Sequence, residues 1–258
     1  MLDREFYKDY CNRFNSVWKW IQTQSVNRED VISEICDLRG YEEKRMKPIL
    51  NELGFSRLPS DLDKSIFRRK ELLDLGLCKE STFLLENRYI FPVKDMLGNV
   101  VALIGWYPDE KKYITTPSLL FSKSGMFFGM EQLSKTGINK KYFLTEGIFD
   151  SLSLRSLGYN AVAQMGIDSS QQKEVLYGLF RRIVAVPDSD SEGKKVVSMD
   201  AWHIPVGSSY MKWSGSGSSK KRVIKDIDDF CNYYDYDTMV SLLADALNDS
   251  GRIIEYKI

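Results

Sequence analysis

Acidic residues form three groups in the second half of the sequence, and two of these groups directly follow apolar runs that we expect to be strands. Glu146 and Asp150 follow one run, and Asp188 and Asp190 follow another. In an extended or turn segment, residues two apart point the same way, so Asp188 and Asp190 could hold one cation or two neighbouring ones. The third group, Asp226–Asp229, repeats the two-apart spacing. Hard carboxylate ligands of this kind predict a site for Mg²⁺ or Mn²⁺.

Each acid taken singly also has a simpler interpretation. An Asp after a strand often caps the next helix or stabilises a turn. Three such groups in order, two of them at strand ends, are harder to explain in that way. Packed carboxylates repel one another unless a cation neutralises them. We therefore expect a divalent-metal site in preference to three sets of caps.

Scarce residue types argue against other chemistries. His203 is the single histidine, which disfavours a His base, a two-His metal site or a Ser-His-Asp triad. The four cysteines are isolated, so we expect no zinc, no disulfide framework and reduced, cytosolic thiols. The Gly-x-x-x-x-Gly-Lys-Ser/Thr spacing of a P-loop is absent.

Charge and hydropathy narrow the class of protein further. The 258 residues include 36 Lys and Arg and 36 Asp and Glu, so the formal net charge is zero. This balance hides segregation, because residues 111–123 and 212–225 carry basic side chains and no acid. No apolar run approaches the ~18 residues of a membrane span, and the polar N-terminus does not resemble a secretory signal. We expect no membrane partner and a location in the cytoplasm of a bacterial or phage-infected cell.

Strands and helices alternate from residue 141 onward and must position the acids. Short apolar strands alternating with helices predict a parallel sheet with helices on both faces. Ligands of such sheets bind beyond the carboxyl ends of the strands, where the acids stand. The expected strands are 142–145, 160–163, 182–186 and 201–206, and the expected helices are 148–157, 169–180 and one from about 192.

The flanking sequence predicts other elements. Residues 1–55 show helical spacing of apolar side chains, and residues 56–80 indicate a linker and a further helix. Residues 89–93 and 100–106 predict a β-hairpin around a turn at 94–99, followed by a strand near 111–114. A helix at 236–247 and a strand at 252–258 complete the chain.

The acidic groups and their context resemble the TOPRIM domain of topoisomerases, primases and some nucleases. Lys141–Asp150 (KYFLTEGIFD) and Val184–Lys194 (VAVPDSDSEGK) match its Glu-Gly after a strand and its later Asp-x-Asp-x-x-Gly. The upstream region looks like the RNA-polymerase core of bacterial and phage DnaG-type primases. The segments that carry this second resemblance are Leu72–Leu77 (LLDLGL), Asn87–Gly105 (NRYIFPVKDMLGNVVALIG), Lys112–Pro117 (KYITTP), Leu120–Met130 (LFSKSGMFFGM) and Lys225–Phe230 (KDIDDF).

The resemblance implies a fold and a division into domains. The implied fold class is α/β, with a TOPRIM parallel sheet flanked by helices, preceded by a small α+β primase subdomain and an N-terminal helical segment. The expected divisions are a helical segment (1–55), a basic α+β primase-core subdomain (56–138), a TOPRIM catalytic domain (139–230) and a C-terminal helix and strand (231–258).

The resemblance also implies roles for individual residues. In the family, the acids bind divalent metal at a nucleotidyl-transfer centre, where two cations activate the primer 3′-hydroxyl and stabilise the pyrophosphate leaving group. The implied metal ligands are Glu146, Asp150, Asp188, Asp190, Asp226 and Asp228. Among these, Glu146, Asp188 and Asp190 are the implied catalytic residues, with general base as an alternative role for Glu146. Arg88, Lys112, Lys123 and Lys194 are the implied contacts to nucleic acid or nucleoside triphosphates.

The function that the resemblance implies is a primase, which makes short RNA primers on single-stranded DNA with Mg²⁺ or Mn²⁺, two or more ions. Its implied partners are the template, nucleoside triphosphates and a replicative helicase in trans. The family's N-terminal zinc-binding domain and fused helicase are missing, which suggests a reduced, phage-like form. Trp106 and Tyr107 also stand where the family often has a second glycine and an arginine.

Two alternatives remain open. The same acids could serve a TOPRIM-type metal-dependent nuclease, although such nucleases lack the primase-like hairpin region. The chain could also be a non-catalytic, primase-like accessory subunit that binds DNA or a helicase. A topoisomerase would need a tyrosine nucleophile on further large domains, for which this sequence has no room.

Overall fold

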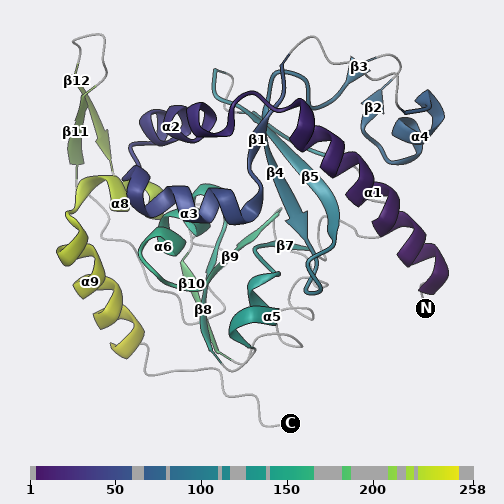
Figure 1. Cartoon of the computed structure of the whole chain (residues 1–258). Helices are drawn as coiled ribbons and strands as arrows, with labels where there is room; N and C mark the ends of the chain where they lie inside the picture. The colour runs from purple at the N-terminus through teal and green to yellow at the C-terminus, as the bar shows by residue number, and fades with distance from the viewer. Residues whose placement is uncertain are drawn as a thin grey trace. The chain divides into compact units, whose positions relative to one another are not determined.

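The computed structural model describes residues 4–59, 67–79, 82–109, 112–116, 126–137, 140–165, 182–186, 209–213, 219–223 and 226–249 (Figure 1). The chain divides into two compact units, Met1–Lys123 and Ser124–Ile258. Among the helices that the structure describes, none combines the length and the apolar character needed to cross a bilayer.

Unit 1 begins with three helices, as the sequence predicts. They are α1 (Arg4–Gln24), α2 (Arg28–Arg39) and α3 (Glu43–Leu53). The Asn27 side chain caps α2 by accepting a hydrogen bond from the backbone N–H of Glu29 at 3.1 Å. Gly54 ends α3 at φ 80°, and a Cβ there would lie 2.7 Å from Nε2 of Gln22. A side chain at residue 54 would therefore strain the backbone, and the Gln22 side chain would have to shift to make room for it.

An antiparallel sheet follows in the order β1-β4-β5-β6. Its strands are β1 (Ser56–Arg57), β4 (Tyr89–Lys94), β5 (Val100–Tyr107) and β6 (Lys112–Thr115). The pairing of β4 with β5 confirms the predicted hairpin. Its turn is closed by Asp95, whose Oδ1 accepts the backbone N–H groups of Leu97 and Asn99, each at 2.8 Å. The short elements α4 (Arg69–Asp74), β2 (Cys78–Lys79) and β3 (Thr82–Phe83) lie between β1 and β4 in the sequence.

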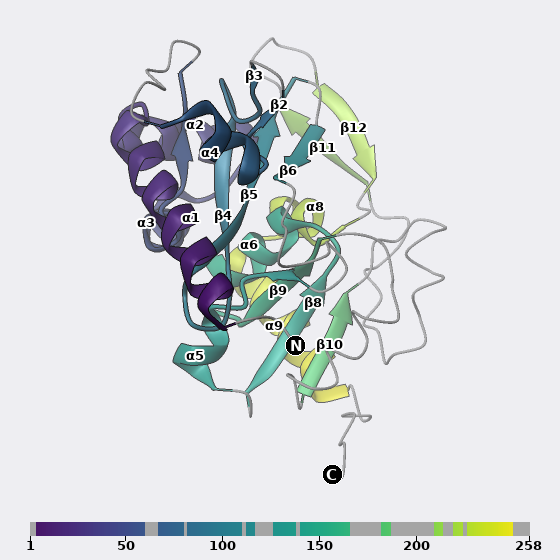
Figure 2. The same cartoon turned by 90° about the vertical axis from the view of Figure 1, so that its right-hand side faces the viewer.

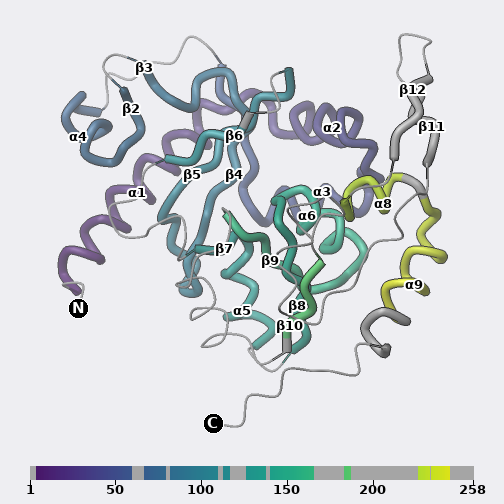
Figure 3. Tube along the Cα trace, turned by 180° about the vertical axis from the view of Figure 1, so that it is seen from behind, coloured from purple at the N-terminus to yellow at the C-terminus, as the bar shows by residue number. Residues whose placement is uncertain are grey.

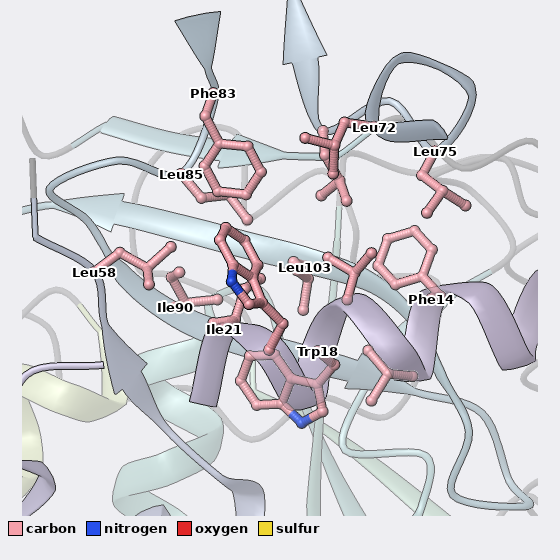
Figure 4. Packing of buried hydrophobic residues seen from close by; sticks show 14 of the residues in the cluster. Phe14, Trp18, Ile21, Leu58, Leu72, Leu75, Phe83, Leu85, Ile90 and Leu103 are labelled. Atoms are coloured by element: carbon pink, nitrogen blue, oxygen red, sulfur yellow. The ribbon is translucent and has the colours of Figure 1, made fainter. Parts of the chain in front are cut away.

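The core of unit 1 forms where α1 packs on this sheet (Figure 4). Phe14 and Ile21 of α1 are fully buried in the same cluster as Leu103 of β5. The cluster also takes in Leu72 and Leu75 from the region of α4. This packing explains the aromatic and aliphatic spacing of the first helix, because one face of α1 is buried against the sheet.

Unit 2 contains a four-stranded sheet in the order β10-β8-β9-β7, and Figure 2 labels its strands β8, β9 and β10. The strands β8 (Lys141–Thr145), β9 (Ala161–Gln164) and β10 (Arg182–Val186) are parallel, which confirms the prediction of a parallel sheet. The short strand β7 (Phe127–Phe128) runs antiparallel to β9 at one edge. The sequence predicts no strand at these residues, so the antiparallel edge strand is an addition to the predicted sheet.

Helices cover both faces of this sheet. Phe143 of β8 and Val184 of β10 pack in one cluster with residues of α6 (Ile148–Ser156), α8 (Ile227–Tyr233) and α9 (Tyr236–Asp249). Tyr142 and Leu144 face the other way and pack with Leu133 of α5 (Gln132–Thr136). Alternate residues of β8 therefore serve opposite faces, as the two-residue period of a strand requires. Figure 3 traces α8 beside α6.

Two further strands, β11 (Ser209–Trp213) and β12 (Ser219–Val223), pair with each other as an antiparallel ribbon. The sequence predicts no strand at either segment, so the ribbon is an additional element. The predicted helices at 169–180 and from about 192, and the predicted strands at 201–206 and 252–258, lie outside the described residues.

Candidate active site

The turn from β8 into α6 presents two of the predicted acids. Glu146 directly follows β8 and is half-buried, and Gly147 is the N-cap of α6. The Thr145 hydroxyl donates to the carbonyl oxygen of Gly147 at 3.0 Å and so fixes the turn. A Cβ on Gly147 would lie 2.4 Å from Oδ2 of Asp150. Because the φ of −102° suits any residue, this glycine is needed for the space that the Asp150 carboxylate occupies.

Asp150 joins α6 to α8. Its Oδ1 accepts the backbone N–H of Asp228 at 2.9 Å. The Ser153 hydroxyl, one turn further along α6, donates to Oδ1 of Asp228 at 2.8 Å. Ser153 is fully buried, and Asp150 and Asp228 are 8% and 6% exposed. The two carboxylates are therefore held in fixed positions by hydrogen bonds between the helices.

Asp226 supplies the third carboxylate of this group. It is the N-cap of α8, and its Oδ1 accepts the backbone N–H of Asp229 at 2.7 Å. Asp150 thus satisfies one unpaired N–H of the first turn of α8, and Asp226 satisfies another. Negative charge at a helix N-terminus is also stabilised by the helix dipole. The caps explain how α8 tolerates several acids in and before its first turn.

The carboxylates of this group affect the pKa of the Cys231 thiol. Burial raises its pKa well above the ordinary value, and the nearby carboxylates of Asp228, Asp150 and Asp226 raise it further. All three carboxylates therefore lie close enough to the thiol to raise its pKa. This agrees with the hydrogen bonds that bring α6 and α8 together.

The parallel pairing of β8 and β10 brings two strand ends together. Val186, the last residue of β10, is in register with Thr145, the last residue of β8. Glu146 follows Thr145 in the sequence, and Asp188 is the second residue after Val186. Asp188, Asp190, Lys123 and Lys194 lie outside the described residues.

The oxygen atoms of this group suit a hard divalent cation. Three aspartates offer carboxylate oxygens, and Ser153 adds a hydroxyl oxygen beside Asp228. Within the part of the chain that the structure describes, no three His, Cys, Asp or Glu residues converge as metal ligands. Asp150, Asp226 and Asp228 are brought together but do not complete a site by themselves. Residues beyond the described ranges would have to contribute.

Two predicted basic residues belong to unit 1. The Arg88 guanidinium lies over the ring of Tyr107, with 5.7 Å between the carbon Cζ and the ring centroid. Its Nη1 is buried and has no hydrogen-bond partner among the residues that the structure describes. A Cβ on Gly105 would lie 2.8 Å from Cδ of Arg88, so the glycine makes room for the arginine. Lys112 pairs with Tyr107 at the start of β6.

Sequence reasoning missed Ser153 and Thr145. Ser153 stands three residues after Asp150 in a predicted helix, and this spacing places two side chains on one helix face. The spacing could have identified it as a neighbour of the acids. Its bond to Asp228 joins residues 75 apart in the sequence, and no local pattern indicates that contact.

Comparison with known proteins supports the sequence resemblance. Residues 143–230 match a family model described as Toprim-like. A DNA primase of Buchnera aphidicola is 29% identical over 174 residues, covering 61% of this chain and 30% of that protein. A DNA primase of Clostridium acetobutylicum is 28% identical over 170 residues, covering 60% of this chain and 28% of that protein. The chain therefore spans about a third or less of the length of these relatives.

A solved structure of a DnaG primase catalytic domain bound to ssDNA has a similar fold. The TM-score is 0.69 at 15% identity, covering 94% of this chain and 80% of that chain. At this identity the likeness concerns the fold alone. It confirms the predicted α/β class.

Proposed function

We propose that the chain is a DNA primase, because it is similar to DNA primases over part of their length and matches a Toprim-like family model. In this proposal it is a nucleotidyltransferase that makes short RNA primers on single-stranded DNA during replication. The observation that carries the proposal is the acidic end of the unit 2 sheet, where β8 ends in register with β10 and α6 is bonded to α8. This arrangement supports a centre built from acids that are far apart in the sequence.

The proposed metal ligands come from three segments. The β8–α6 turn supplies two, the sequence after β10 supplies two and the start of α8 supplies two: Glu146, Asp150, Asp188, Asp190, Asp226 and Asp228. Two or more Mg²⁺ or Mn²⁺ ions, with no zinc, would activate the primer 3′-hydroxyl and stabilise the pyrophosphate leaving group. Within the protein, Ser153 and the Asp228 backbone N–H hold the carboxylates in place, and Gly147 leaves room for Asp150.

The proposed proton acceptor is Glu146. Its carboxylate follows β8 and is half-buried, which leaves it access to a substrate at the sheet end. As general base it would accept the proton of the attacking 3′-hydroxyl. Asp188 and Asp190 are the other proposed catalytic residues.

The proposed contacts to template or nucleoside triphosphates are basic residues: Arg88, Lys112, Lys123 and Lys194. For Arg88, the buried Nη1 has no partner within the described ranges, and this supports a role in binding an anion, because an unsatisfied buried donor is costly. The proposed partners are single-stranded DNA and a replicative helicase in trans, and the proposed location is the cytoplasm.

A primer-synthesis assay tests the proposal. The protein is incubated with single-stranded DNA, labelled nucleoside triphosphates and Mg²⁺ or Mn²⁺, with and without a helicase. We expect short RNA products that disappear in Glu146→Gln and in Asp188→Asn. Asp9→Asn, a similar change at an exposed residue of α1, is the control and should retain synthesis.

Other outcomes of the same assay select an alternative. Degradation of the DNA without synthesis would identify a nuclease that uses the same acids. Binding of DNA with neither activity, unchanged by the two substitutions, would identify an accessory subunit. Either result overturns the primase proposal.

A further inference from the structure

The helix α6 makes a second set of buried polar contacts that the proposed catalytic centre does not use. They lie between α6 and the residues that begin α5, and we call this set the α5 junction. Its four side chains are polar or charged and are buried: Glu131, Gln132, Ser151 and Arg155. Burying such groups costs free energy unless each finds a partner, so their gathering at one place requires a physical reason.

The carbonyl oxygen of Ala161, at the start of β9, is the centre of the junction. It accepts hydrogen bonds from Nε2 of Gln132 at 2.7 Å and from the Ser151 hydroxyl at 3.0 Å. Nε2 of Gln132 also donates to the carbonyl oxygen of Gly129 at 3.0 Å. A Cβ on Gly129 would lie 2.7 Å from that Nε2 and 3.0 Å from the Ala161 oxygen. The glycine therefore lets α5 and β9 approach closely enough for these contacts.

An ion pair forms the other half of the junction. Nη1 of Arg155 lies 3.5 Å from Oε1 of Glu131. Ser151 and Arg155 are four residues apart, so they share one face of α6. A buried ion pair adds little stability over an apolar pair of similar volume, but it requires a particular orientation of its partners. The orientation of α6 is therefore the property that this pair is suited to control.

The junction and the acids lie on roughly opposite sides of α6. Successive residues of a helix are rotated by about 100°, so Asp150 and Ser153 together point roughly 150° away from the junction residues of α6. The contacts agree, because Asp150 and Ser153 bond to α8 whereas Ser151 bonds to β9. A rotation of α6 about its axis would break the junction and would turn the Asp150 carboxylate away from its present direction.

We propose that the α5 junction fixes the rotation of α6 and thereby holds the Asp150 carboxylate toward the catalytic metal. Ser151 and Arg155 are positioning residues in this proposal, and Asp150 is the residue through which they act. The proposal rests on the proposed function only in taking Asp150 as a metal ligand, and it requires no primer synthesis.

Two double variants test the ion pair. Glu131→Leu/Arg155→Met removes both charges, so no buried charge is left unpaired and the protein is expected to fold. Arg13→Met/Asp74→Leu makes the same kind of change in an exposed ion pair of unit 1 and is the control. Mn²⁺ binding is measured without nucleic acid or nucleotides. The measurements are the Mn²⁺ concentration at half-maximal thermal stabilisation and the electron paramagnetic resonance signal of free Mn²⁺.

Two single variants test the hydroxyl group of the junction. Ser151→Ala removes the bond to the Ala161 carbonyl oxygen and leaves no charge behind. Tyr142→Phe is the matched control, because it removes a buried hydroxyl that bonds to Thr136 of α5. These variants test the proposal independently of the ion pair and of any difficulty in folding that the double variant has.

We expect Glu131→Leu/Arg155→Met and Ser151→Ala each to raise the Mn²⁺ concentration for half-saturation by about twofold to thirtyfold, the range for residues that act through others. Both controls should leave it unchanged. Melting temperatures in EDTA measure the stability of each variant separately from its affinity for Mn²⁺. Unchanged Mn²⁺ affinity in both junction variants, an equal loss in the controls, or no Mn²⁺ binding by the unmodified protein overturns the proposal.

The same proteins separate this proposal from the primase proposal. Mn²⁺ binding that the junction variants weaken, without primer synthesis by the unmodified protein, supports the junction and contradicts the primase. Primer synthesis with the same Mn²⁺ dependence in every variant supports the primase and contradicts the junction.

Discussion

Hydrogen bonds to individual carboxylates decide how the acids of unit 2 are arranged. Asp150 and Asp228 are almost fully buried, and each accepts a hydrogen bond from the other helix or its backbone. Buried carboxylates are tolerated when they are bonded in this way. The bonds have a second effect, because they fix the directions of the oxygen atoms before any ligand binds. Ser153 is then a positioning residue for Asp228.

Removing the Ser153 hydroxyl should loosen Asp228. We expect Ser153→Ala to lower the free energy of unfolding by about 1.5–3 kcal/mol, because the bond is buried and its acceptor is charged. We also expect the Mn²⁺ concentration at half-maximal thermal stabilisation to rise about tenfold or more, as for other residues that orient metal ligands.

Ser156→Ala is the matched control for this prediction. Ser156 is on the same helix, and its hydroxyl donates to the carbonyl oxygen of Ser153 instead of to a carboxylate. Its loss should leave the Mn²⁺ dependence unchanged. A similar change in both variants would show that the effect comes from the helix and not from Asp228.

At the scale of elements, α6 is tied to its surroundings on several sides. Ser151 donates to the carbonyl oxygen of Ala161 in β9 at 3.0 Å, and Asp150 bonds to α8. Arg155 forms an ion pair with Glu131, which precedes α5, with 3.5 Å between Nη1 and Oε1. These contacts hold the helix that carries Asp150 against both its sheet and α8.

Replacing only one residue of the Arg155–Glu131 ion pair should lower the free energy of unfolding strongly. The two side chains are 6% and 9% exposed, so either single change leaves a buried charge, at a cost of about 3–5 kcal/mol. We expect the double variant Glu131→Leu/Arg155→Met to lose much less stability than the sum of the two single variants. Urea unfolding of all four proteins measures this coupling.

The exposed pair Arg13–Asp74 is the comparison for this cycle, with side chains 33% and 46% exposed. Its coupling should be about 0–1 kcal/mol, because water screens the charges. Similar coupling energies for the two pairs would contradict the view that burial makes the Arg155 pair strong.

The packing of α2 gives unit 1 a sensitivity to alkaline pH. Burial raises the pKa of the Cys36 thiol to about 11, and the charges of Glu43 and Asp37 add to the shift. Because the folded pKa lies above the unfolded one, stability is complete below about pH 8.5 and is lost as the pH rises toward 11. The loss should be roughly 2–3 kcal/mol.

Urea unfolding between pH 8 and 11 measures this effect. Cys36→Ala should show a shallower decline with pH than the unmodified protein. Tyr7 and Tyr89, whose pKa values are also raised by burial, act in the same direction in both proteins. Parallel pH profiles would show that the Cys36 thiolate does not drive the loss.

For the whole molecule, the zero net charge conceals a segregation of acidic and basic residues along the chain. Acids gather at the end of the unit 2 sheet, whereas the β11–β12 ribbon has only basic charged residues. A divalent cation at the acids would remove negative charge near the ribbon and leave a net positive region. Nucleic-acid binding should then depend on both metal and salt.

We expect the affinity for single-stranded DNA to be modest, to increase with Mg²⁺ and to fall as NaCl increases. Fluorescence anisotropy in Mg²⁺ and in EDTA, each at several NaCl concentrations, measures these dependences. Tight binding in EDTA would mean that the acids do not oppose binding, and it would contradict the role given to charge segregation.

Local patterns in the sequence were sufficient to predict much of the fold. Asn27 before α2 and Asp95 in the β4–β5 turn are polar residues at the positions that caps and turns require, and the predicted turn at 94–99 is confirmed. The strand β8 was recognisable because a short apolar run ends abruptly at Glu146. The grouping of Asp150, Asp226 and Asp228 was anticipated from the resemblance and their order along the chain.

Other features left no local signal. Strand β7 is only two residues long, so it shows no periodicity. Strand β12 is rich in lysine and lacks the apolar alternation by which strands are recognised. The Ser153–Asp228 bond depends on the docking of α8 on α6, which tertiary packing decides.

The connection between α6 and α8 also bears on the order in which unit 2 folds. The segment β8–α6–β9 is continuous in sequence and forms its contacts by closing short loops, whereas α8 must return from far along the chain. Short loops close at a lower entropic cost and therefore earlier. We expect β8–α6–β9 to assemble first and the docking of α8 to be among the last steps. In hydrogen exchange, the amides of α8 should then open at lower free energy than those of β8, so the acids would be the last to come together and the first to separate.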